Sequence, residues 1–378
     1  MNKRRILIIA TLVALVAAAI PILKIIKQDD FSSTPHSFGV SINLPLTGPI
    51  AFPGKSFQEA ALLALDDLKK ESTSKSATFD WNDNTGSPAT AATIAKRQVL
   101  SDTSIYLVGY SAETLAVQPI LSATSKPIFS FSFMASITKE AQIFRNLISF
   151  KAEYPIFVKY AKKRQSRKIA IIFADLPEPR EEFEKFVIPE LVLSGWKESD
   201  FVMFPYAVME TDFRTIVAKL AQASPDLIII NGFNTTLAPI VMALRNSQLV
   251  RDGNVIGTFD LIDVPKLIGD EAVEGMALAT PKFLIAPSKK ALDFQNRFQS
   301  RYGRQPSYSD FAGYDFVLIV NDLASRLPNT LTPQQLIDAI QRTNIEGVSG
   351  HITFDQDGDA SPLVTTAVFR SGQLTPLE

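Results

Sequence analysis

Cysteine is absent from this chain of 378 residues, which excludes disulfides, thiol catalysis, iron–sulfur clusters and a lipidated N-terminal cysteine. Histidine is scarce as well, because only His36 and His351 occur and neither has a second ligand at metal-binding spacing. A histidine-based zinc site and a Ser-His-Asp triad are therefore not expected. We predict no cofactor and no metal ion.

The chain also lacks an excess of either charge, since 38 Lys and Arg stand against 39 Asp and Glu. No basic stripe interleaved with aromatic residues occurs, so we predict no nucleic-acid partner. No Gly-rich phosphate loop is present, and Thr47-Gly-Pro follows the first predicted strand. The acid pairs Asp66-Asp67 and Glu181-Glu182 are more typical of solvated helix faces than of acid–base catalysis. We predict a protein that is not an enzyme.

The N-terminus combines a basic segment at residues 2–5 with an uncharged apolar run from Ile6 to Leu23. This charge pattern places the N-terminus in the cytoplasm and exports the rest of the chain. Cleavage at Ala17–Ala19 and an uncleaved signal anchor, a hydrophobic helix over 1–27 spanning the inner membrane, are both compatible with it, and the anchor is favoured. The globular part is expected in the periplasm or on the extracytoplasmic face of the inner membrane, with residues 6–26 as anchor and 28–36 as linker.

Strands and helices alternate over most of the remaining chain, as in doubly wound α/β proteins with parallel sheets. The length and two such series in succession predict two lobes. After Pro281 the pattern changes to three helices and then to strands, with hairpin turns predicted at Asp357-Gly358 and Ser371-Gly372. The segment 355–359 has acids spaced as in a calcium loop but lacks the closing glutamate, so a turn is favoured.

The stretch from Ile105 to Thr138 reads as strand, Gly-Tyr-Ser turn, helix and second strand. In open α/β sheets, ligands bind beyond the carboxyl ends of the strands. Ser111 and Ser132 follow two such ends and are the first candidates for ligand contact. The alternative is that both serines only cap helices or turns.

Eight short motifs occur in one order along the chain. They are Thr47-Gly-Pro-Ile-Ala…Gly54, Asp83…Ser87-Pro88, Val108-Gly109…Ser111, Lys126-Pro127-Ile128, Asp212-Phe213, Glu274-Gly275-Met276, Tyr308…Gly313-Tyr314-Asp315 and Val348…Gly350…Asp355…Gly358-Asp359. Together they resemble the periplasmic solute-binding proteins of the leucine/isoleucine/valine-binding type, with the type 1 periplasmic binding protein fold.

This resemblance implies two Rossmann-like lobes, a three-crossover hinge and a small-molecule ligand in the cleft between the lobes. Crossovers near Ser149, Lys282 and Glu346 would give lobe one as 37–149 plus 283–345 and lobe two as 150–282 plus 346–378. Hinge closure would signal to a membrane permease of an ABC-type transporter. The alternative is a membrane-anchored sensor or receptor ectodomain that lost transport function.

The resemblance also suggests site residues, and here the sequence departs from the amino-acid-binding pattern. The serine for the ligand carboxylate is kept as Ser111, with Thr114 at the start of the next helix. The second hydroxyl falls at Met134, with Ser132 nearby, and the first-loop aromatic falls at Pro53, beside Phe52. A second-lobe tyrosine is replaced by Phe233 or Asn234.

The acid that pairs with a ligand ammonium falls at Phe259 or Asp260. With Asp260 facing the cleft, an amino-acid-like ligand is expected, because a desolvated ammonium needs a carboxylate. With Phe259 facing it, an apolar or aromatic ligand is expected in an aromatic pocket. That pocket would gather Phe52, Phe131, Phe133, Met134, Phe233 and Phe259.

Overall fold

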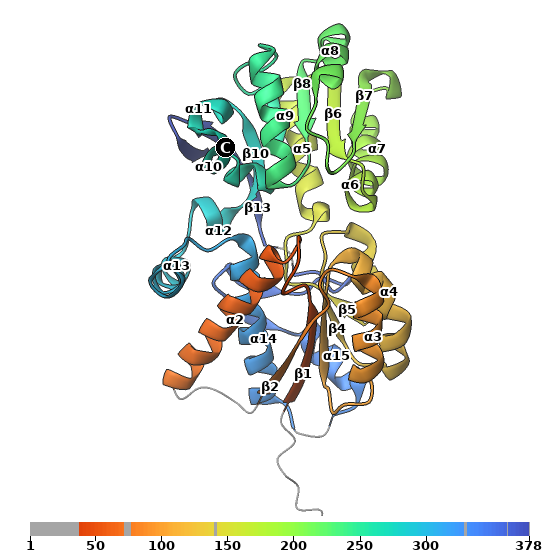
Figure 1. The fold of residues 1–378 in the computed structure, drawn as a ribbon, viewed down its shortest axis with the longest axis vertical. Helices are drawn as coiled ribbons and strands as arrows, with labels where there is room; N and C mark the ends of the chain where they lie inside the picture. The colour runs from red at the N-terminus through yellow and green to blue at the C-terminus, as the bar shows by residue number, and fades with distance from the viewer. Residues whose placement is uncertain (1–37, 72–76, 140–141, 329–330, 361, 378) are drawn as a thin grey trace, which may run out of the picture. The chain divides into compact units, whose positions relative to one another are not determined.

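The computed structural model describes residues 38–71, 77–139, 142–328, 331–360 and 362–377. These residues form an α/β fold of two lobes, each with a central sheet between layers of helices (Figure 1). The predicted anchor at 1–27 and linker at 28–36 lie outside the described residues. Among the helices that are described, none is both long enough and apolar enough to cross a membrane.

The sheet of the first lobe has five strands in the order β2-β1-β3-β4-β5, all parallel. Its elements are β1 (Phe38–Leu44), α2 (Phe52–Lys70), β2 (Ala77–Asp83), α3 (Pro88–Gln98), β3 (Ile105–Gly109), α4 (Ser111–Leu121), β4 (Ile128–Phe131), the short 3₁₀ helix η2 (Ala135–Lys139), β5 (Ile143–Phe144), α13 (Lys289–Tyr302), α14 (Tyr308–Arg326) and α15 (Pro333–Gln341). Strand residues alternate between the faces: Ile105 and Leu107 pack toward α14, whereas Tyr106 and Val108 pack toward α3 and α4.

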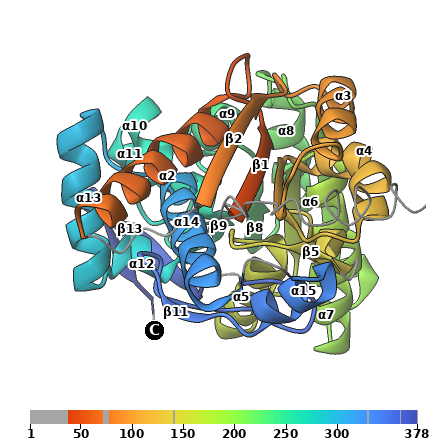
Figure 2. The same cartoon turned by 90° about the horizontal axis from the view of Figure 1, so that it is seen from below.

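Helices α2 and α14 lie side by side over one face of this sheet (Figure 2). Gly313 permits the close approach, since a Cβ there would lie 2.2 Å from the carbonyl oxygen of Phe57. Two residues on, the buried Asp315 accepts hydrogen bonds from the backbone of Val348 at 2.6 Å and of Ser349 at 3.0 Å. Both late motifs of the sequence therefore have a packing role.

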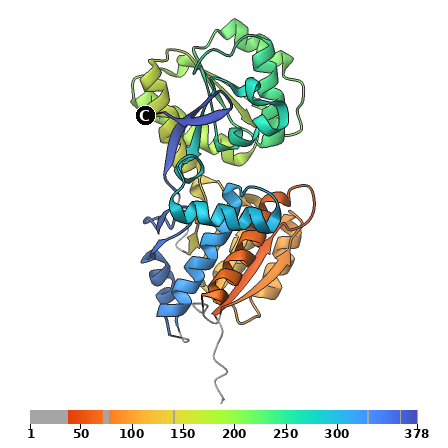
Figure 3. The same cartoon turned by 90° about the vertical axis from the view of Figure 1, so that its left-hand side faces the viewer.

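The sheet of the second lobe has the order β14-β13-β10-β9-β8-β6-β7, and its pairings are parallel except for those of β13, which is antiparallel to both β10 and β14. Helices cover both of its faces (Figure 3). Its elements are α5 (Phe150–Arg164), β6 (Ile169–Ala174), α6 (Pro177–Glu182), the π turn η3 (Phe183–Val187), α7 (Ile188–Leu193), β7 (Phe201–Tyr206), α8 (Arg214–Ala223), β8 (Leu227–Ile230), α9 (Asn234–Asn246), β9 (Val255–Gly257), the 3₁₀ helix η5 (Phe259–Asp263), α10 (Pro265–Ile268), α11 (Asp270–Val273), β10 (Ala277–Pro281), α12 (Lys282–Ile285), β13 (Val364–Arg370) and β14 (Gln373–Pro376).

The C-terminal part of the chain differs from expectation in one place. The hairpin at Ser371-Gly372 is confirmed, because β13 and β14 pair across it and both residues have positive φ, 49° and 75°. The turn at Asp357-Gly358 forms but joins no hairpin, since β12 (His351–Thr353) pairs backward with β11 (Asn344–Glu346). Ile352 packs in the first-lobe core, beyond the crossover expected near Glu346. The residue limits given for the two lobes stay a prediction.

Candidate functional site

Ser111 and Ser132 meet at the carboxyl ends of β3 and β4. Their hydroxyl oxygens lie 2.5 Å apart and both side chains are buried. Ser132 also accepts a hydrogen bond from the backbone N–H of Met134 at 3.2 Å. Parallel pairing of β3 with β4 brings the two ends together, so the structure joins residues that are 21 positions apart in the sequence. Their part in ligand binding stays a prediction.

Thr114 lies one turn further along α4 and is fully buried. Its hydroxyl pairs with that of Ser130 in β4 at 2.9 Å. A second hydroxyl pair, one helical turn along α4 from the first, links the same helix to β4. Thr114 thus fixes α4 against β4.

An aromatic cluster connects the two lobes. The ring of Phe133, which follows β4, lies 5.6 Å from that of Phe259 at the start of η5 and 5.8 Å from that of Tyr308 at the start of α14. Phe259 and Tyr308 lie 4.7 Å apart and meet edge to face, and Phe150 stacks on Phe133 from α5 at 5.9 Å. Such geometries stabilise aromatic pairs beyond their burial.

Phe259 and its neighbour Asp260 have different surroundings. The Phe259 ring is 1% exposed within the aromatic cluster, whereas Asp260 is partly exposed. Desolvation, with a smaller contribution from the charge of Asp263, raises the pKa of Asp260 to about 8. The negative charge of Asp260 contributes to raising the pKa values of both Tyr308 and Tyr206. Its carboxyl therefore lies near groups of both lobes.

The remaining candidates are placed apart from these clusters. Phe52, at the start of α2, is 61% exposed, and its ring lies 5.6 Å from the guanidinium of Arg304. Pro53 is the next residue of α2 and is partly buried. Phe233 is 37% exposed at the N-cap of α9, and Asn234 is the first residue of that helix.

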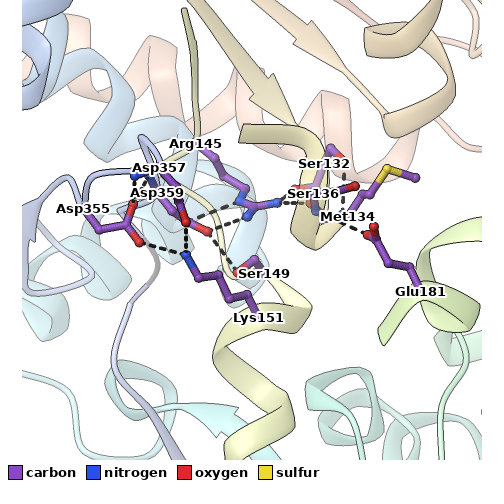
Figure 4. Close-up of polar contacts among 10 residues, drawn as sticks. All are labelled: Ser132, Met134, Ser136, Arg145, Ser149, Lys151, Glu181, Asp355, Asp357 and Asp359. Carbon is purple, nitrogen blue, oxygen red and sulfur yellow. Dashed lines mark hydrogen bonds and ion pairs between the residues drawn. The ribbon is translucent and has the colours of Figure 1, made fainter. Parts of the chain in front are cut away.

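A buried ion pair fixes the backbone that carries Ser132 and Met134 (Figure 4). Arg145, directly after β5, has no exposed side-chain surface and pairs with Asp359 at 2.5 Å. Its Nη1 donates to the carbonyl oxygens of Ser132 at 3.0 Å and Met134 at 2.7 Å. Ser149 donates to the same Asp359 carboxylate at 3.2 Å. One arginine thus ties the segment after β5 and the turn at Asp359 to the end of β4.

The acidic segment 355–359 is a turn, as the sequence predicts. Asp355 accepts hydrogen bonds from the backbone N–H groups of Asp357 and Asp359, both at 2.9 Å. Lys151 pairs with Asp355 at 3.1 Å and with Asp357 at 2.6 Å. Cationic side chains of the chain itself therefore neutralise the acids whose spacing is similar to that of a calcium loop (Figure 4).

The interpretation of Glu181-Glu182 as a solvated pair is wrong. Glu181 is 8% exposed, and its carboxylate accepts a hydrogen bond from the backbone of Ser136 in the first lobe at 3.3 Å. Glu182 is fully buried, and neither of its carboxyl oxygens has a hydrogen-bond partner among the described residues. Helix α6 packs against α5, which turns this acid inward.

Glu153 is a second buried acid, in the first turn of α5. Its Oε1 accepts a hydrogen bond from the backbone N–H of Phe259 at 2.9 Å, while Oε2 has no partner in the described part of the chain. Burial raises the pKa of both carboxyls well above the usual range, and the charge of Glu153 raises that of Glu182 further. Asp260 adds to the effect on Glu153.

Sequence reasoning missed Arg145, Glu153, Glu182 and Tyr308 as site residues. Arg145 had a usable signal, since it stands in a mostly apolar segment, residues 143–150, and a buried guanidinium requires a partner. Tyr308 belongs to a motif that the family resemblance rests on. The two glutamates had no signal, because an acid in the first turn of a helix, such as Glu153, or at a helix end, such as Glu182, is ordinary at the surface.

The fold agrees with the comparisons. The model of the periplasmic binding protein family matches residues 39–372, and the chain belongs to this family. A curated relative, the leucine-, isoleucine-, valine-, threonine- and alanine-binding protein of Pseudomonas aeruginosa, is 21% identical over 339 residues, which cover 87% of this chain and 88% of the relative.

Two solved structures illustrate the range of similar proteins. The branched-chain amino acid transporter substrate-binding protein of Streptococcus pneumoniae, in complex with isoleucine, has a TM-score of 0.74 at 18% identity and covers 89% of this chain and 97% of its own. A solute-binding protein of an ABC transporter from Rhodopseudomonas palustris, in complex with 3,4-dihydroxybenzoic acid, has a TM-score of 0.76 at 20% identity, with 90% and 96% covered. At these identities the likeness shows the fold and leaves the ligand open.

Proposed function

We propose that this chain is an extracytoplasmic solute-binding protein that closes its two lobes on a small amino-acid-like molecule and presents it to the permease of an ABC-type transporter. The aromatic cluster is the observation that carries this proposal. Phe133 and Tyr308 of the first lobe contact Phe259 of the second. The carboxyl ends of the strands, where α/β proteins bind ligands, therefore face one another across this contact.

Asp260 supports an amine-bearing ligand over a purely apolar or aromatic one. Phe259 is packed against first-lobe rings and offers little free surface. Asp260 is partly exposed, and no hydrogen bond or ion pair to it occurs within the described residues. A ligand ammonium would supply the missing partner, while the hydroxyls of Ser111 and Ser132 would accept or donate at its other end.

A thermal-shift screen of the full-length chain tests this function. Amino acids, amides and aromatic acids are the solutes to compare, because a ligand that binds the folded state selectively raises the melting temperature. We expect amine-bearing solutes to raise it. If no solute in the panel does so, solute binding is not the function.

Ser111→Ala tests the first-lobe half of the site. We expect weaker ligand binding by about 0.5–1.5 kcal/mol, the usual contribution of one hydrogen bond. The melting temperature of the unliganded protein should change little, since Ser132 keeps its bond from the Met134 backbone. Unchanged affinity in the variant removes Ser111 from the site.

A membrane-tethered sensor is the second candidate, supported by the uncharged apolar run within residues 6–26. Mass spectrometry of the mature protein separates the two. A new N-terminus near Ala17–Ala19 supports a released transport component. Retention of residues 1–27 supports a tethered receptor.

A further inference from the structure

Two carboxyls without counter-charge lie beside the proposed ligand site. Glu153 and Glu182 have side chains with no exposed surface. Three of their four oxygens have no hydrogen-bond partner among the residues that the structure describes. Buried polar groups are nearly always hydrogen-bonded in folded proteins. An unpartnered buried carboxyl therefore calls for an explanation, and two of them together call for a common one.

Both acids belong to the ligand-facing edge of the second sheet. Glu182 ends α6, the helix that follows β6. Glu153 accepts a hydrogen bond from the backbone N–H of Phe259, the first residue of η5, which follows β9. Asp260 follows at the partly exposed end of the same group. The three carboxyls thus extend from the proposed site into the second lobe.

Basic side chains near these acids in sequence are engaged elsewhere. Lys151 pairs with Asp355 and Asp357. Arg180 pairs with Asp175 and Glu184, both at 2.6 Å. Lys185 lies 3.6 Å from the Glu181 carboxylate, and Lys266, in α10, pairs with Asp263 at 2.6 Å. None of these contacts neutralises Glu153, Glu182 or Asp260.

Two hydroxyls in the same lobe also lack partners among the described residues. The Oγ1 atoms of Thr258, directly before Phe259, and of Thr280, in the neighbouring strand β10, are buried and unpartnered among the described residues. Hydroxyl and carboxyl oxygens accept hydrogen bonds from ammonium and guanidinium groups. The hydroxyls can donate as well as accept, but ionised carboxylates only accept, and it is the carboxylates that suit a cationic donor rather than an anion.

We propose that the solute bound by this protein carries a net positive charge, and that Asp260 contacts its cationic group while Glu153 and Glu182 hold that group from behind. This inference rests on the proposed function and narrows its ligand class to diamines, basic amino acids or guanidines. Without the cation the buried acids keep their protons, because an isolated charge there is costly. Binding of the cation ionises them and releases protons.

Isothermal titration of the full-length chain with lysine, arginine, putrescine, leucine and benzoate tests the proposal. We expect a cationic probe to bind more tightly than leucine by about tenfold or more, a difference well within the reach of one charged contact. Glu182→Gln and Glu153→Gln should each remove most of that preference. Glu184→Gln is the matched control, since Glu184 is near Glu182 in sequence but its carboxylate is 45% exposed and pairs with Arg180.

Proton release gives a second readout that needs no variant. Titrations in two buffers of different ionisation enthalpy at pH 7 should show protons leaving the wild-type protein as the cationic probe binds. The inference is overturned if leucine or benzoate binds more tightly than every cationic probe, or if the cation binds without proton release and equally well to Glu182→Gln. In both cases solute binding stands. If none of the five probes binds, the ligand class proposed here is wrong, and the wider screen decides the proposed function.

Discussion

Asp359 and Glu182 are both buried acids, and their surroundings differ completely. Asp359 faces the guanidinium of Arg145 and accepts a further hydrogen bond from Ser149. Glu182 faces another acid and has no partner in the described residues. A buried ion pair with all its hydrogen bonds made is a structural element. A buried acid without a partner lowers stability and indicates a functional constraint.

Arg145→Met removes the ion pair with Asp359 and should have the largest effect on stability. We expect a loss of about 3–5 kcal/mol in the free energy of unfolding, because Asp359 would stay buried without its counter-charge. Urea denaturation of wild type and variant measures it. Arg145→Met combined with Asp359→Leu should recover much of the loss, since no charge is then left unpaired. A double variant as unstable as the single one would show that the loss comes from the missing contacts of Arg145, such as its hydrogen bonds to Ser132 and Met134, and not from the unpaired charge.

The unpaired carboxyl of Glu182 should make the stability of the protein depend on pH. The pKa of Glu182 is raised above its usual value of 4.5, so above pH 4.5 the folded protein retains a proton that the unfolded chain loses. Stability therefore falls as the pH rises through this window, by about 1.4 kcal/mol per pH unit for each such group. Denaturation midpoints measured between pH 5 and pH 8 test this.

Glu182→Gln supplies the comparison for that experiment. The amide does not titrate, so the decline of stability with pH should become shallower than in the wild type. Glu184→Gln should leave the slope unchanged, because Glu184 is exposed. Equal slopes in all three proteins would mean that Glu182 is not protonated in the folded state.

Lys151→Ala should have the smallest effect. Lys151, in the first turn of α5, pairs with Asp355 and Asp357 of the turn that also carries Asp359, but its side chain is 36% exposed. Exposed ion pairs contribute about 0–1 kcal/mol. Thermal unfolding of this variant should nearly match that of the wild type. A loss as large as that of Arg145→Met would mean that the whole loop acts as one unit.

The sequence predicted the fold well because alternation is a local signal. The apolar run at Ile169–Ala174 became a strand buried on both faces, as such runs in parallel sheets do. The turn at Ser371-Gly372 was recognisable from residues that tolerate positive φ. The pairing of β12 was not recognisable, because which strand accepts its backbone hydrogen bonds depends on packing of Ile352 in the first-lobe core.

The candidate site divides in the same way. Ser111 and Ser132 were found because each follows a predicted strand end, and strand pairing then brought them within hydrogen-bond distance. The family resemblance suggested Phe52 as a site residue in the first loop. Its ring lies beside Arg304 instead, and the position of Arg304 depends on α13 and α14, which are distant in sequence. A position in a predicted loop indicates that a side chain is exposed, but it does not indicate which residues the side chain faces.

The sequence by itself determined the fold class of this protein, two α/β lobes with largely parallel sheets, since the alternation of strands and helices is a local signal. Only the tertiary structure decided the electrostatics. Whether an acid is solvated, paired or isolated depends on which side chains of other elements surround it. Asp359 acquired an arginine that is 214 positions away, and Glu182 acquired only another acid.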